Sequence, residues 1–131
     1  MESFIIAGED KPIFTPEVIM DIASGKCSIK GESYLEEPFK LYEDILGWLH
    51  QFAENHSGKP IVLDIELTYI NSTSSRAILD LFRGLADMKE AGKNIDVRWR
   101  YPEGDDDFNE IREEGEEFID ESGLDIELVS Y

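Results

Sequence analysis

The clearest pattern in the chain is a change of hydrophobic period within residues 60–88. Residues 61–70 are apolar almost without interruption, which predicts a central strand buried on both faces. The polar run Asn-Ser-Thr-Ser-Ser at residues 71–75 then interrupts it and predicts a turn. From Arg76 the apolar positions recur at helical spacing as far as Met88, which predicts an amphipathic helix. Four consecutive hydroxyl residues therefore lie where the central strand passes into a helix.

Three weaker patterns precede this stretch. The short apolar segment at residues 4–6 predicts either an edge strand or an ordered arm. Loose alternation on either side of a Ser-Gly-Lys turn predicts a β-hairpin over residues 18–30. Helical spacing then runs over residues 39–55, and Pro38 suits the first turn of that helix.

Three further elements are predicted after the central strand and helix. Gly92 marks the end of the second helix, and residues 95–101 alternate between apolar and charged, as in a strand with one polar face. A third helix is predicted to open at residues 104–107 and to end at Gly123. Residues 124–129 make a last strand.

The predicted order is a β-rich start followed by α-β-α-β-α-β. Repeated right-handed crossovers predict an α/β fold, with a mixed, mostly parallel β-sheet, helices packed on it and a β-hairpin near the N-terminus. The chain has 131 residues and shows no linker, repeat or low-complexity tail, so we expect one domain over residues 1–131.

The net charge of −18 narrows the class of partner. Such a surface repels phosphate backbones and anionic lipids, so nucleic acid and membrane surfaces are poor partners, whereas a basic protein is easily accommodated. The alternative is that the acidity serves only solubility. The single cysteine, Cys27, excludes an internal disulfide, and no segment resembles a signal peptide or reaches the roughly 20 apolar residues of a membrane span. We therefore expect a cytoplasmic protein.

The hydroxyl cluster has two interpretations, and both can hold. In the first, Asn71 or Ser72 caps the helix by accepting hydrogen bonds from its free N–H groups. In the second, one hydroxyl is a phosphorylation site, because a phosphate there meets the positive end of the helix dipole and adds about −1.5 to −2 charges. A catalytic serine is disfavoured, since the chain has no G-x-S-x-G elbow and nothing obvious orients His50 or His56.

Carboxylates are the other candidate chemistry. Asp64 and Glu66 alternate with apolar residues in the central strand, where they form an acid pair, hold a cation or, as we favour, make a polar face open to solvent. Asp105 to Asp107 lack the spacing of a calcium loop, and the sequence has no Gly-rich phosphate loop, so we expect neither a metal nor a cofactor. Trp99 with its flanking arginines suits a protein contact, but the alternation favours ordinary strand packing.

Three segments of the sequence resemble the SiaC family of bacterial regulatory phosphoproteins. They are GESYLEEPFKLYEDILGWL, LDIELTYINSTSSRAILDLF and IDVRWRYPEGDDDFNEI, and the likeness runs from about Gly31 to the C-terminus. Its most specific part is the Y-[IL]-N-[ST]-[ST]-S run at residues 69–74, supported by the G-[DE]-S-Y run at residues 31–34. The strand–serine–helix plan also resembles the STAS-like fold of SpoIIAA-type anti-sigma-factor antagonists, which places its phosphorylated residue at the same helix mouth.

The resemblance implies a non-enzymatic switch. In the family, a kinase of the SiaB type phosphorylates one Ser or Thr after the Asn, and a PP2C-type phosphatase removes the phosphate. The unmodified form activates a diguanylate cyclase, which raises cyclic di-GMP and favours biofilm or aggregation. On this chain the implied phosphorylation site is Ser72, or Thr73 next to it, although the family has threonine directly after Asn71. The implied partner-binding residues are Tyr69, Asn71, Ser72, Thr73, Ser74 and Arg76.

Three other functions stay open on the sequence. The first is a partner-switching anti-sigma-factor antagonist, which the second resemblance implies. The second is a constitutive acidic adaptor without a switch. The third is a small enzyme with Asp64 or Glu66 as acid or base near the Ser72 turn, although neither His50 nor His56 is placed to assist it and the sequence has no metal motif or nucleotide loop.

Overall fold

Six strands and three helices make up the part of the chain that this computed structural model describes, residues 1–9, 15–56, 58–104 and 109–131. The strands are β1 (Phe4–Ile6), β2 (Glu17–Met20), β3 (Lys26–Ser33), β4 (Ile61–Ile70), β5 (Ile95–Tyr101) and β6 (Ile126–Ser130). The helices are α1 (Phe39–Asn55), α2 (Ser72–Glu90) and α3 (Glu110–Ser122). This order agrees with the order predicted from hydrophobic periodicity.

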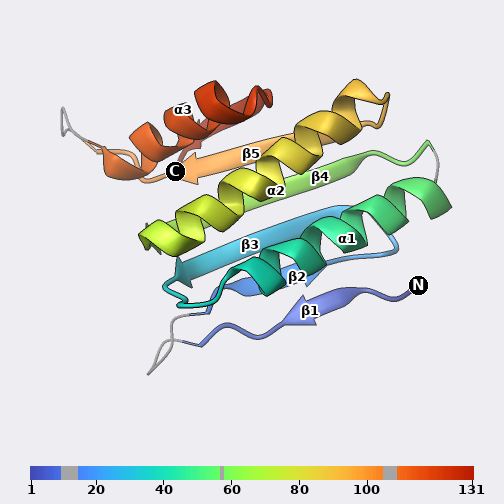
Figure 1. Ribbon diagram of the computed structural model, residues 1–131, viewed down its shortest axis with the longest axis horizontal. Coiled ribbons are helices and arrows are strands. Elements are labelled where there is room, and N and C mark those ends of the chain that lie inside the picture. The colour runs from blue at the N-terminus through green and yellow to red at the C-terminus, as the bar shows by residue number, and fades with distance from the viewer. Residues whose placement is uncertain (10–14, 57, 105–108) are drawn as a thin grey trace.

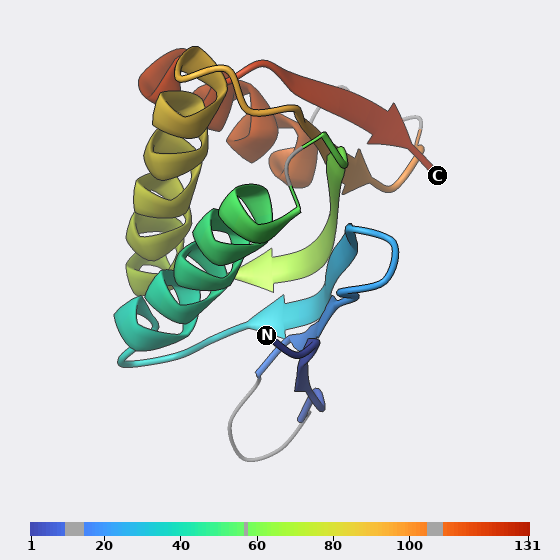
Figure 2. The same cartoon turned by 90° about the vertical axis from the view of Figure 1, so that its right-hand side faces the viewer.

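The strands form one mixed sheet in the order β1-β2-β3-β4-β5-β6. β2 is antiparallel to both β1 and β3, so the predicted hairpin is confirmed and the N-terminal segment is an edge strand. β3, β4, β5 and β6 are parallel, as predicted. Each helix carries the chain from one parallel strand to the next in a constant direction across the sheet. The three helices consequently lie on one face of it (Figures 1 and 2).

None of the three described helices covers the opposite face of the sheet (Figure 2), so the expectation of a central strand covered on both faces is wrong. Burial alternates along β4, and the side chains under the helices are those of Ile61, Leu63, Ile65 and Leu67. Val62, Asp64 and Glu66 between them are only partly buried. The apolar run overstates burial because Val62 places an apolar side chain on the open face. Asp64 and Glu66 belong to the polar face that we favoured for them.

Trp99 is central to the core between the sheet and the helices. Its side chain is fully buried and lies edge-on to Phe82 and Phe118, with ring centroids 6.2 and 5.3 Å away. Its Nε1 donates to the carbonyl of Ile111 in α3 at 2.7 Å. Gly115 permits this close approach, because a Cβ there would lie 2.6 Å from Trp99 Cδ1. Trp99 is therefore a packing residue, as the alternation predicts.

The helices differ from the predicted ones at their N-termini. α2 begins at Ser72 behind the cap Asn71, so the hydroxyl run is the first turn of the helix and not a separate turn. α3 begins at Glu110, and the predicted opening at residues 104–107 falls mostly on residues 105–108, outside the described part of the chain. Pro38 directly precedes α1. Among the helices described, none has the length and apolar composition that crossing a bilayer requires.

Candidate functional site

Asn71 fixes the junction between β4 and α2. Its Oδ1 accepts from the N–H of Ser74 at 2.9 Å, and its Nδ2 donates to the carbonyl of Leu35 at 2.9 Å. Its backbone N–H donates to the carbonyl of Ser33 at 3.1 Å. The capping interpretation is confirmed for Asn71, whereas Ser72 is the first helical residue. Asn71 thereby ties the start of α2 to the connection between β3 and α1.

The hydroxyl residues of this first turn lie at different depths. Ser72 is exposed, Thr73 and Ser75 are half-buried, and Ser74 has no exposed surface. Successive helical residues are rotated by about 100°, which directs Ser74 towards the sheet while Ser72 stays in solvent. The side chain of Ser72 is therefore accessible from solvent. Ser74, predicted as a partner-binding residue, has no surface to present to a partner.

A chain of buried hydroxyls joins this turn to β3 and α1. Tyr42 Oη donates to Ser33 Oγ at 2.8 Å, and Ser33 Oγ donates to Ser74 Oγ at 2.9 Å. Burial raises the pKa of Tyr42 to about 12, so its phenol stays protonated even at alkaline pH. Sequence reasoning missed Ser33 and Tyr42. The G-E-S-Y run is a signal for Ser33, but periodicity carries no information on a contact across 41 residues.

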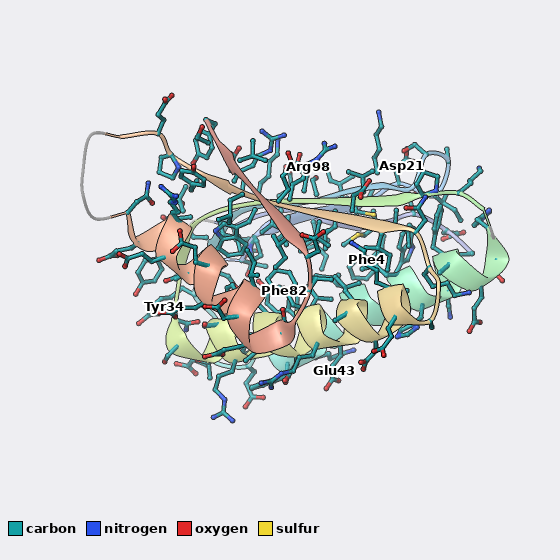
Figure 3. The ribbon with its side chains drawn as sticks, turned by 90° about the horizontal axis from the view of Figure 1, so that it is seen from above. Phe4, Asp21, Tyr34, Glu43, Phe82 and Arg98 are labelled. Carbon is teal, nitrogen blue, oxygen red and sulfur yellow. The ribbon has the colours of Figure 1, made fainter. Side chains whose placement is uncertain are left out.

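Two exposed tyrosines lie beside the same turn. Tyr69, near the end of β4, is 48% exposed, and Tyr34, just after β3, is 49% exposed. Their rings stack with centroids 5.6 Å apart and an interplanar angle of 29°. Figure 3 shows Tyr34 at the end of the molecule where α2 begins. Tyr69 was predicted as a partner-binding residue, whereas sequence reasoning missed Tyr34 because its contact with Tyr69 is made between two strands.

Arg76 lies one helical turn after Ser72, where α2 faces α3. It is exposed and borders a groove of about 160 Å³ between the two helices. The residues that line the groove are Ser75, Arg76, Leu79, Glu114, Glu117, Phe118 and Glu121. Glu114 Oε2 is buried there without a hydrogen-bond partner among the described residues. Burial, followed by the charges of Glu110 and Glu117, raises the pKa of Glu114 to about 7.

Asp64 and Glu66 lie on the open face of the sheet, away from this turn. Asp64 Oδ1 accepts from Arg100 Nε at 2.6 Å, and this hydrogen bond raises the pKa of Arg100. Ile70 is six residues beyond Asp64 along β4, or about 20 Å at the usual rise of a strand. The structure therefore does not bring Asp64 to the Ser72 turn. No group of three or more His, Cys, Asp and Glu side chains in the described ranges is placed to hold a metal ion.

Comparison with known sequences assigns the chain to a family. Residues 7–131 match the SiaC family regulatory phosphoprotein model. The uncharacterized protein PA14_02130 of Pseudomonas aeruginosa (strain UCBPP-PA14) is 29% identical over 100 residues, which cover 76% of this chain and 79% of that protein. The family match begins just after β1 and extends over β2 to β6, so the segments that form the α2 junction all lie within it.

Solved structures of SiaC from Pseudomonas aeruginosa have the same fold. Apo-SiaC is similar with a TM-score of 0.80 and 26% identity, over 98% of this chain and 99% of that one. SiaC in its crystal structure with the diguanylate cyclase SiaD, which it activates, gives a TM-score of 0.81 and 26% identity over the same shares, 98% and 99%. With a family match that spans residues 7–131, this chain belongs to the SiaC family of regulatory phosphoproteins.

Proposed function

We propose that this chain is a regulatory switch controlled by reversible phosphorylation of Ser72, with Thr73 as the adjacent alternative. The observation that carries the proposal is the exposed hydroxyl of Ser72 at the first position of α2. Ser72 directly follows the cap Asn71, whose side chain is hydrogen-bonded both to Ser74 and to Leu35. Membership of a family of regulatory phosphoproteins supports it. Thr73 is half-buried, so Ser72 is the more accessible acceptor.

A phosphate on Ser72 changes the charge at one end of α2. It adds about −1.5 to −2 charges beside the positive end of the helix dipole. As the first residues of a helix, Ser72 and Thr73 have no intrahelical acceptor for their N–H groups, which leaves these donors to the phosphate. A partner that covers the phosphate must remove its hydration, which costs several kcal/mol unless the charge is paired. That cost is enough to abolish a contact of micromolar affinity.

The partner in this proposal is a diguanylate cyclase that the unmodified chain binds and activates. Similarity to SiaC of Pseudomonas aeruginosa supports this partner, because that SiaC is the activator of the diguanylate cyclase SiaD and forms a crystallised complex with it. A kinase of the SiaB type adds the phosphate and a PP2C-type phosphatase removes it. Activation raises cyclic di-GMP and favours biofilm or aggregation. The chain itself catalyses no reaction in this scheme.

The partner-binding surface in this proposal consists of the exposed side chains around the first turn of α2. These are Tyr69, Ser72, Thr73 and Arg76, each exposed or half-buried. Asn71 and Ser74 support this surface from behind, through the cap and the buried hydroxyl chain. A substitution of either supporting residue is therefore expected to act through the position of Ser72.

Phosphopeptide mass spectrometry of the protein from its native host tests the modification, and a cyclase assay tests the switch. We expect one phosphate on Ser72 or Thr73. Unmodified protein and Ser72→Ala should both activate the purified cyclase, while protein with phosphoserine encoded at position 72 should bind at least about tenfold more weakly. Ser75→Ala, in the same turn, is the matched control and should leave both phosphorylation and activation unchanged.

Two outcomes would contradict the proposal. Activation by the phosphoserine protein at the level of the unmodified protein would remove the switch. No phosphate under any growth condition, with a partner still retained in a pull-down, would leave a constitutive acidic adaptor.

A further inference from the structure

The stacked pair Tyr34–Tyr69 is an exposed aromatic surface on a strongly charged molecule. Each ring leaves about half of its surface in solvent although the two rings cover one another. The pair joins the ends of two parallel strands, since Tyr69 pairs with Glu32 in the register of β3 and β4. Contiguous exposed aromatic surface is typical of protein contact sites, because it combines a large apolar area with little conformational entropy.

Hydrogen bonds hold this pair beside Asn71, the cap of α2. Tyr34 lies between Ser33 and Leu35, and the carbonyls of both flanking residues accept from Asn71. Tyr69 is two residues before Asn71 on the other strand. The aromatic pair and the first turn of α2 are therefore parts of one continuous surface, so a partner that covers one of them approaches the other.

The sign of the phosphate charge restricts what the partner can place on these rings. A lysine or arginine over the rings would be attracted further by a phosphate on Ser72, so phosphorylation would strengthen that contact. An uncharged apolar side chain would instead have to approach and dehydrate the phosphate, so phosphorylation would weaken the contact. Release on phosphorylation, which the proposed function requires, fits the apolar partner.

We infer that Tyr34 and Tyr69 together anchor the diguanylate cyclase, through an uncharged cluster of aliphatic or aromatic side chains on the cyclase. This inference rests on the proposed function and adds the chemistry of the partner and a second anchoring residue, Tyr34. The contact depends on burial of apolar surface, so it forms despite the net charge of −18 and is insensitive to salt.

Titration of the full-length chain against the purified diguanylate cyclase of its own genome tests the inference, with SiaD of Pseudomonas aeruginosa as a second probe. Tyr34→Ala and Tyr69→Ala should each weaken binding at least about tenfold, while Tyr34→Phe, which keeps the ring, should stay within about threefold of wild type. Raising NaCl from about 50 to about 500 mM should change the Kd less than about threefold.

Ile5→Ser is the matched control for loss of exposed apolar surface. Ile5 is 69% exposed on β1, which lies three strands away from β4 in the sheet, so this variant should bind like wild type. The inference is overturned if both alanine variants bind as tightly as wild type, or if the Kd rises steeply with salt. Either result leaves the proposed function standing. If unmodified wild type binds neither cyclase, the proposed effector is wrong and this docking surface is lost with it. Thermal melting of each variant separates a binding defect from unfolding.

Discussion

At the residue scale, how deeply each side chain of the first turn of α2 is buried gives identical residues different roles. Ser72 and Ser74 are the same amino acid two positions apart, yet Ser72 is exposed while Ser74 is buried against Ser33. Phosphorylation requires an accessible hydroxyl, and a buried hydroxyl requires a hydrogen-bond partner. Ser72 can therefore serve as the modified residue, while Ser74 contributes to the stability of the turn.

Ser33→Ala should lower the free energy of unfolding by about 1–3 kcal/mol, because it leaves the buried hydroxyls of Tyr42 and Ser74 without Ser33 between them. Urea denaturation measures this difference. Ser72→Ala is the control and should stay within about 0.5 kcal/mol of wild type, since its side chain is exposed. Adding Tyr42→Phe to Ser33→Ala should recover part of the loss. A Ser33→Ala protein as stable as wild type would show that the hydroxyl chain contributes nothing.

At the element scale, glycines in different helices have different surroundings, because Gly115 in α3 is buried against the sheet while Gly47 in α1 is exposed. α3 approaches β5 and β6 so closely that a Cβ on Gly115 would lie 2.6 Å from Trp99 Cδ1 and 2.8 Å from Leu128 Cδ2. α1 contains a glycine as well, but a Cβ on Gly47 would meet nothing within 4 Å. The same residue type is thus required for packing in one helix and is only a weak helix former in the other.

Gly115→Ala should destabilise the protein by about 1–3 kcal/mol, because the new methyl group overpacks the space beside Trp99. Gly47→Ala should stabilise it by about 0.5–1 kcal/mol, because alanine restricts the unfolded chain and favours the helix. Chemical denaturation of the two variants measures both changes in the free energy of unfolding, which should have opposite signs. Equal effects of the two substitutions would mean that α3 has room to move away from β5.

At the scale of the whole molecule, the excess of carboxylates affects stability where a carboxylate is partly buried, as at Glu114. Most of the 30 acidic residues face solvent, but Glu114 lies in the groove between α2 and α3, where one of its oxygens is buried and accepts no hydrogen bond within the described part of the chain. The charged groups that face this groove are Arg76 from α2 and Glu117 and Glu121 from α3, with Glu110 one turn before Glu114. Ionisation of Glu114 therefore adds a negative charge next to other negative charges.

The contribution of Glu114 to stability should fall as the pH rises from about 4.5 to about 7. Its pKa is raised from 4.5 to about 7 by burial and by neighbouring glutamates, so the folded protein binds this proton more tightly than the unfolded chain does. The stabilisation is complete below the unfolded pKa and is lost as the pH passes the folded pKa. Melting temperatures of wild type and Glu114→Gln across this range isolate the effect. The melting temperature of the variant should rise relative to that of wild type as the pH increases. Parallel curves of melting temperature against pH would contradict the raised pKa of Glu114.

The order of elements could be predicted from the sequence because periodicity is a local property of the chain. The alternation in residues 95–101 and the helical spacing in residues 39–55 each identify one element without knowledge of its neighbours. The start of α2 could not be placed in the same way. Residues 72–75 are polar and small, and their helical conformation depends on the cap that Asn71 makes and on hydrogen bonds to β3.

The sequence by itself determined the class of fold, a mostly parallel sheet, and the position of the hydroxyl run after the central strand. These features follow from hydrophobic period and from the handedness of crossovers, which are properties of short segments. Only the tertiary structure decided which face of the sheet is open, which serine is buried, and that Tyr34 stands beside Tyr69. Each of these depends on contacts between residues far apart in the chain, and such contacts leave no period in the sequence.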